Sequence, residues 1–234
     1  RLEKGWLSGF LPIDISSKQY MTSTNTNQQR LAALREKGYD FDLDQVFRKS
    51  WEMFLKQPLF SMAFTLLIFS LQVLALVYLD KFVFLFGMLV APPLYSGFYL
   101  VVFKISADQP VVYPDFFKGF TYYFPTVLIW LVGQVLVSLG IFALIIPGVY
   151  LAVAYNFAVL MAIFGGFDFW KALEESRKLI TVRWWKFFVY TLIVLLINLG
   201  GVLTFGIGLL VSVPITFYST YILFEQLTKD ALAE

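Results

Sequence analysis

Long apolar runs separated by shorter polar segments dominate the pattern of this chain. Six runs have about the length that a helix needs to cross a hydrocarbon core of about 30 Å. None carries a charged residue in its interior, and they cover residues 58–79, 83–104, 122–138, 141–165, 186–200 and 203–224. The pattern predicts an all-α integral membrane protein with six transmembrane helices.

The connections between these runs alternate in length. Those at residues 80–81, around Gly140 and at residues 200–201 are very short, whereas residues 105–121 and 166–185 form longer, polar connections. A very short connection joins helices that run antiparallel to each other. The sequence therefore predicts three helical hairpins joined by two longer loops.

The positive charges are distributed on one side of this predicted topology. Of the 18 Lys and Arg residues, Lys81 alone falls on the side of the short turns. Lys and Arg near span ends are retained on the cytoplasmic side of a membrane. We therefore expect a multi-pass protein with both termini in the cytoplasm.

A short amphipathic segment precedes each predicted hairpin, most clearly at residues 44–56 and 169–180 and more briefly at 114–120. Such segments favour short helices that lie on the cytoplasmic surface of the membrane. Tryptophan is typical of this boundary, because its ring is apolar and its N–H is polar. The predicted interfacial anchors are Trp51, Trp170, Trp184 and Trp185.

Glycine and proline recur at similar places in the three hairpins. Gly87 precedes Pro93 by six residues, Gly208 precedes Pro214 by six, and Gly140 precedes Pro147 by seven. This spacing indicates an internal threefold repeat. Proline removes a backbone hydrogen bond, so we expect helix kinks at Pro93, Pro147 and Pro214. Packing and bending are the common roles of such residues, and lining a cavity is the alternative.

Composition supports a membrane protein and excludes most catalytic chemistry. With 59% hydrophobic and 15% charged residues and a mean hydropathy of +0.73, the chain lacks the polar surface of a soluble domain of this size. It contains no Cys and no His, which removes the commonest metal ligands and the usual general base. We expect no enzymatic activity, no metal site and no cofactor, and a net charge of +2 indicates no nucleic-acid partner.

Three amides within the predicted spans form a candidate polar cluster: Gln134, Asn156 and Asn198. Bonding between helices is the usual role of buried amides, but the three can also border a small site. We therefore keep two functions open. The first is an accessory or interaction subunit of a larger membrane complex, in contact with lipid and with another membrane protein. The alternative is a lipid or small-molecule transporter-like protein with a mid-membrane cavity.

The expected domains are a polar N-terminal arm (1–40), a six-helix membrane domain (41–226) and a short C-terminal tail (227–234). Within the domain, residues 146–153, 170–179 and 184–188, together with the last hairpin between Asn198 and Pro214, carry a familiar pattern. It resembles a group of uncharacterised bacterial six-helix membrane proteins, with Bacteroidetes-type members nearest, that is similar to the membrane domain of some glycerophosphodiester phosphodiesterases. The resemblance implies this fold and a place in the bacterial cytoplasmic membrane, without an activity.

Overall fold

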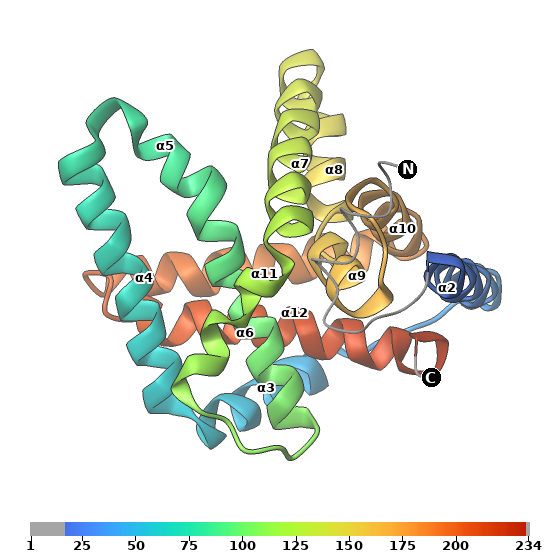
Figure 1. The fold of residues 1–234 in the computed structure, drawn as a ribbon, viewed down its shortest axis with the longest axis horizontal. Helices are drawn as coiled ribbons and strands as arrows, with labels where there is room; N and C mark the ends of the chain where they lie inside the picture. Colours follow the sequence, from blue (N-terminus) through green and yellow to red (C-terminus); the bar gives the residue numbers. More distant parts are fainter. Residues whose placement is uncertain (1–16, 233–234) are drawn as a thin grey trace.

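The computed structural model describes residues 17–232, and all regular structure in that range is helical (Figure 1). Three helices have a polar composition: α2 (Ser17–Lys37), α3 (Leu43–Lys56) and α10 (Phe169–Thr181). The apolar helices are α4 (Pro58–Leu79), α5 (Val83–Leu85), α6 (Ala91–Ser106), α7 (Tyr123–Ala143), α8 (Ile145–Ala154), α9 (Ala158–Gly165), α11 (Trp184–Leu203) and α12 (Leu209–Leu232). Two 3-10 segments, η1 (Asp80–Phe82) and η3 (Tyr113–Tyr122), and a π-helical segment, η2 (Phe86–Val90), complete the chain.

Four segments of the described range are long and apolar enough to cross a membrane. They are Pro58–Ser106, Tyr113–Ala143, Ile145–Gly165 and Trp184–Leu203. The first contains two of the six predicted runs, because the helix continues with little interruption through η1 and η2. The prediction of an all-α, multi-pass membrane protein is confirmed at this level.

The sixth predicted run, 203–224, is not among these four segments, and the structure gives it a different environment. It belongs mostly to α12, whose middle carries hydroxyl side chains at residues 216 and 218–221. α12 contacts α2, α3, α4, α6, α9 and α11. Tyr218, Leu223 and Phe224 on this helix are almost completely buried. α12 is therefore the central helix of the protein core.

The other apolar helices project from this core in different directions. Figure 1 shows an open V at the left, with α4 as one arm and the continuous stretch from α5 through η2 into α6 as the other, and α7 and α8 side by side at the top. α11 and α12 run across both of these pairs instead of parallel to them. We call the connecting ends the first tip (80–82), the second tip (141–146) and the third tip (203–207). The tips point away from one another.

The short amphipathic helices pack against protein with their apolar faces. Asp42 caps α3 by accepting a hydrogen bond from the Asp44 N–H, and Asp168 caps α10 by accepting bonds from two N–H groups of its first turn. Val46 and Phe54 of α3 are buried beside α12, and Leu173 of α10 is buried as well. These helices are held mainly by the core, because that is where their apolar side chains lie.

Both ends of the membrane domain differ from the sequence expectation. The described part of the predicted polar arm is not separate from the domain, because α2 buries Leu31 and packs against α10 and α12. The remainder of the arm, residues 1–16, lies outside the described residues. At the other end, α12 continues through the predicted tail to Leu232, with Leu227 and Ala231 buried. The sequence did not indicate these contacts of α2 and of the end of α12, because both segments are polar and only a few apolar residues make the contacts.

The three prolines have different structural effects. Pro92 and Pro93 have no N–H to donate to the carbonyl groups four residues earlier, and η2 lies directly before them. Pro147 falls in the first turn of α8, where a missing N–H costs no helical hydrogen bond, and Pro214 lies inside α12. The interruptions therefore do not lie at equivalent places in the three helix pairs.

Candidate functional site

The three amides of the predicted polar cluster do not meet. Asn156 donates hydrogen bonds to the Thr191 hydroxyl and the Val153 carbonyl, at 3.0 Å each. Asn198 donates to the Thr216 hydroxyl at 2.7 Å, on α12. Gln134 is exposed on α7. The two asparagines thus use separate partners, and Gln134 shares none of them.

A second polar network, which the sequence analysis missed, lies along α12. The Tyr190 hydroxyl is 2.8 Å from both Ser219 and Thr220, and Tyr218 is 2.8 Å from Ser61 on α4. The spacing of hydroxyl residues along one side of the last apolar run was the available signal. In the described residues, every buried side-chain nitrogen or oxygen has a hydrogen-bond partner. Unsatisfied polar atoms therefore do not mark a ligand site in this part of the chain.

Buried carboxylates join neighbouring helices at two places. Glu175 of α10 has a side chain only 4% exposed and pairs with Arg35 of α2 at 2.5 Å and with Lys178 at 3.2 Å. Asp115 of η3 pairs at 2.7 Å with Lys104 of α6. Because each buried carboxylate faces a cation from another element, the arrangement fits a structural role.

The neighbouring exposed face of α10 carries a helical ion pair. Arg177 donates two hydrogen bonds to the Glu174 carboxylate, at 2.9 and 3.0 Å, and Lys178 lies at 3.5 Å. The hydrogen bonds from Arg177 hold the pKa of Glu174 below its ordinary value. Glu174 is thus a paired anion and does not have the raised pKa of a general acid.

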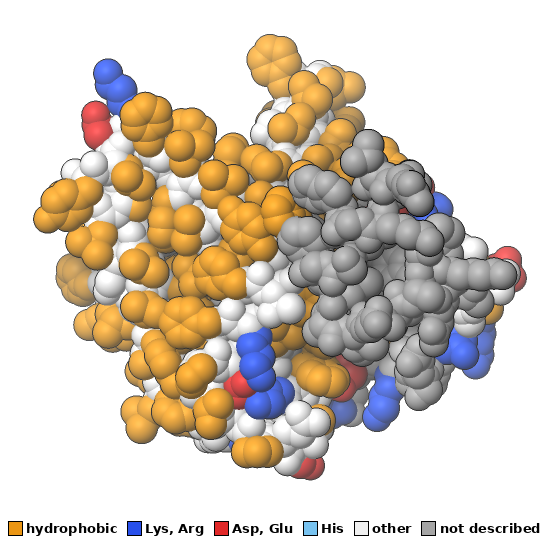
Figure 2. Space-filling view, in the orientation of Figure 1, with side chains coloured by type: hydrophobic (Ala, Val, Ile, Leu, Met, Phe, Trp, Pro, Cys, Tyr) orange, Lys and Arg blue, Asp and Glu red, His pale blue; other side chains and the backbone are white. Residues whose placement is uncertain are grey.

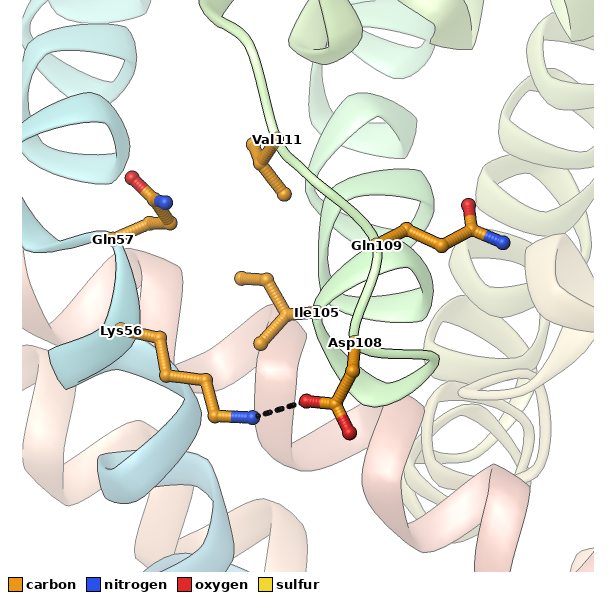
Figure 3. Close-up of a pocket in the computed structure, with 6 residues that line it drawn as sticks. All are labelled: Lys56, Gln57, Ile105, Asp108, Gln109 and Val111. Carbon is orange, nitrogen blue, oxygen red and sulfur yellow. Dashed lines mark hydrogen bonds and ion pairs between the residues drawn. The ribbon is translucent and has the colours of Figure 1, made fainter.

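A shallow pocket of about 190 Å³ lies where α3 meets α4 and the loop after α6 (Figure 3). Lys56 and Asp108 face each other across it at 3.1 Å, and Gln57, Ile105, Gln109 and Val111 complete its lining. Both charged side chains are well exposed and neutralise each other. This pocket is not bordered by any of the three predicted amides, so it is not the expected mid-membrane cavity.

Residues 17–232 contain no group of three or more acidic, His or Cys side chains placed to hold a metal ion. The two buried acids of this region, Glu175 and Asp115, instead face Lys or Arg. Their negative charge is already balanced within the protein.

Exposed apolar side chains form the most extensive feature of the surface. Figure 2 shows hydrophobic side chains over α4 and α5 and over the projecting end of α7 and α8. Phe142 on the second tip is 93% exposed and Phe205 on the third is 100% exposed. Burying such a side chain is worth about 1.5–3 kcal/mol, so leaving these surfaces in water is costly. They require lipid or another protein.

The predicted anchors differ in exposure. Trp51, Trp170 and Trp185 are exposed, as expected of residues that contact lipid. Trp184 is partly buried, stacks on Tyr150 and donates from its Nε1 to the Tyr150 carbonyl at 3.4 Å. Three of the four are therefore available to an external surface, and Trp184 fastens α11 to α8.

Comparisons of the chain with family models, curated proteins and solved structures found no match. The resemblance described from the sequence therefore stays a prediction.

Proposed function

We propose that this chain is a non-catalytic accessory or interaction subunit of a larger complex in the bacterial cytoplasmic membrane. The observation that carries this proposal is the small buried fraction of its apolar helices. Within the most apolar window of Tyr113–Ala143, and likewise of Trp184–Leu203, only 17% of the residues are buried inside the chain. A helix that is apolar on all sides and barely packed within its own chain leaves most of its surface for lipid and a partner helix.

The same proposal includes a topology of six membrane helices in three hairpins, with α3, η3 and α10 at the cytoplasmic surface and both termini in the cytoplasm. The charge distribution supports it. In Figure 2 the Lys and Arg side chains of this face gather along its lower and right-hand parts, apart from one at the upper left, where Figure 1 places η1. Lys81 belongs to η1. Cations on one side favour that side as cytoplasmic.

The interior supports a non-catalytic role. The chain has no His and no Cys, and the Tyr190 hydroxyl and the Asn198 amide are occupied by hydrogen bonds between helices. Glu175 is paired with Arg35 and Lys178. Groups with such partners fix helix positions, whereas a catalytic group must be free to react with a substrate.

The transporter alternative has less support. It predicts a mid-membrane cavity bordered by Gln134, Asn156 or Asn198. The exposure of Gln134 and the separate hydrogen bonds of the two asparagines favour packing instead. We therefore keep the accessory role as the proposal.

Purification of the tagged full-length chain from its own membrane into lipid nanodiscs, followed by mass spectrometry, tests this role. We expect a second membrane protein in a fixed molar ratio, and its absence when an unrelated multi-pass protein carries the same tag. A monodisperse species that contains only this chain and lipid would contradict the proposal.

A further inference from the structure

The three tips differ in charge. The first tip contains Asp80 and Lys81, both exposed. No Lys, Arg, Asp or Glu occurs between Lys118 and Asp168, or between Lys186 and Glu225. The second and third tips lie within these two uncharged stretches. A turn that enters water on the far side of a membrane has no need to be free of charge, and the first tip is charged.

The side chains exposed on these two tips are apolar. Besides Phe142, the second tip exposes Leu144 and Ile146, and besides Phe205 the third exposes Ile207. No other part of the described chain covers them. Large apolar side chains at the extreme end of a helix pair favour contact with hydrocarbon rather than with water.

The backbone of the third tip supplies its own hydrogen-bond partners. The Thr204 hydroxyl donates to the Gly201 carbonyl at 2.8 Å and accepts from the Gly208 N–H at 2.9 Å. The Gly206 N–H is bonded to the Val202 carbonyl at 3.2 Å. Internal satisfaction of backbone groups is what a turn inside a bilayer requires.

Two glycine pairs close the helices tightly beside these tips. A Cβ on Gly140 would lie 2.9 Å from the Gly148 Cα, and one on Gly208 would lie 2.8 Å from the Gly201 Cα. Gly87, beyond the first tip, has nothing within 4 Å of such an atom. The second and third turns are therefore compact, whereas the V between α4 and the stretch from α5 into α6 is open (Figure 1).

Helix direction limits how deeply the tips can reach. α7 has 21 residues and α11 has 20, so each is about 30 Å long, close to the thickness of the hydrocarbon core. Because the two helices run crosswise in Figure 1, they cannot both stand along the membrane normal. At least one of the two is therefore tilted, and the end of a tilted helix of this length falls short of the far surface.

We propose that the second and third tips end inside the hydrocarbon region of the membrane, and that the first tip alone reaches water on the far side. Both apolar tips contact the acyl chains of the lipids. A protein partner in the far aqueous phase would meet this chain at Asp80 and Lys81. This inference rests on the proposed topology, in which all three helix pairs enter from the cytoplasmic side.

Because the natural chain contains no Cys, single-Cys variants of the full-length protein in lipid vesicles test the proposal. Lys81→Cys, Phe142→Cys, Phe205→Cys and, for the cytoplasmic surface, Lys171→Cys would be treated with a charged, membrane-impermeant maleimide. We expect Lys81→Cys and Lys171→Cys to react from opposite sides. Phe142→Cys and Phe205→Cys should react at least tenfold more slowly from either side and become reactive in detergent.

A lipid-contact measurement distinguishes burial in lipid from burial in a second copy. Bimane attached at position 142 or 205 should be quenched by lipids brominated on their acyl chains, and bimane at position 81 should not. Rapid maleimide reaction at 142 and 205 from either side, or no quenching there, would overturn the proposal. Reaction of Lys81→Cys from the same side as Lys171→Cys would instead overturn the underlying topology.

Discussion

Gly97 and Gly119 determine how closely α6 and η3 approach each other. A Cβ on Gly97 would lie 1.8 Å from the Phe116 carbonyl oxygen, and one on Gly119 would lie 1.9 Å from the Pro93 carbonyl oxygen. Backbone therefore touches backbone at these two positions. The contact holds η3 beside α6 and positions Asp115 for its pair with Lys104.

Gly119→Ala should lower the free energy of unfolding by about 3 kcal/mol, because the added methyl group forces two backbones apart. Gly87→Ala is the matched control, since nothing lies within 4 Å of its Cβ position. Thermal unfolding in detergent measures both. Equal shifts in Tm for the two variants would contradict the close approach.

Glu174 gives a pH-dependent prediction. Its pKa is lowered in the folded protein by the Arg177 hydrogen bonds, so the stabilisation is present above the ordinary Glu pKa of about 4.3 and is lost as the pH falls through the lowered value. Wild type should therefore exceed Glu174→Gln in Tm at pH 7, and the difference should vanish at low pH.

Glu52→Gln on the exposed face of α3 is the control for this experiment. Its difference in Tm from wild type should change little between the two pH values. A Glu174→Gln difference that persists at pH 2 would show that the ion pair with Arg177 is not its source.

At the scale of helices, side-chain amides contribute to stability only where they bond one helix to another. Asn198→Leu should cost about 1 kcal/mol, because it removes the bonds that join α11 to Thr216 and Ser212 of α12. Gln134→Leu, on the exposed side of α7, should leave the unfolding free energy unchanged. Denaturant titration in mixed micelles measures both, and an equal loss for Gln134→Leu would indicate a role for that residue that the structure does not give it.

The inward face of α3 holds this helix to the rest of the protein. Phe54 is 3% exposed against the core, whereas Trp51 points outward and is 47% exposed. Phe54→Ala should cost about 3 kcal/mol and speed amide hydrogen exchange throughout α3. Trp51→Glu should leave that exchange unchanged in detergent, where no bilayer is present. Faster exchange in Trp51→Glu than in Phe54→Ala would mean that the outward face holds the helix.

At the scale of the whole molecule, the two ends of the described chain pack against each other, because α12 contacts α2. Leu227 and Ala231 are buried where α12 meets α2. Truncation after Gln226 should therefore lower Tm and expose α2 to trypsin, compared with the untruncated chain. Limited proteolysis of the two purified chains tests this. Equal resistance of α2 in both chains would contradict a structural role for the last turns of α12.

The apolar runs determined much of this protein before any tertiary structure was considered. Residues 58–104, 122–165 and 186–200 form apolar helices because their composition and length leave no alternative, and four of the resulting segments can cross a membrane. The absence of His and Cys, and the position of Lys81, are likewise properties of sequence alone. Such features depend on local composition and do not require knowledge of neighbours in space.

Only the tertiary structure decided which apolar run becomes the core. By hydropathy the run at 203–224 resembles the others, yet α12 is surrounded by six helices, and its hydroxyl residues find partners such as Tyr190 and Ser61. The same applies to the separation of Gln134 from Asn198, the burial of Leu31 and the divergence of the three tips. These depend on contacts between residues far apart in the chain, which hydropathy does not encode.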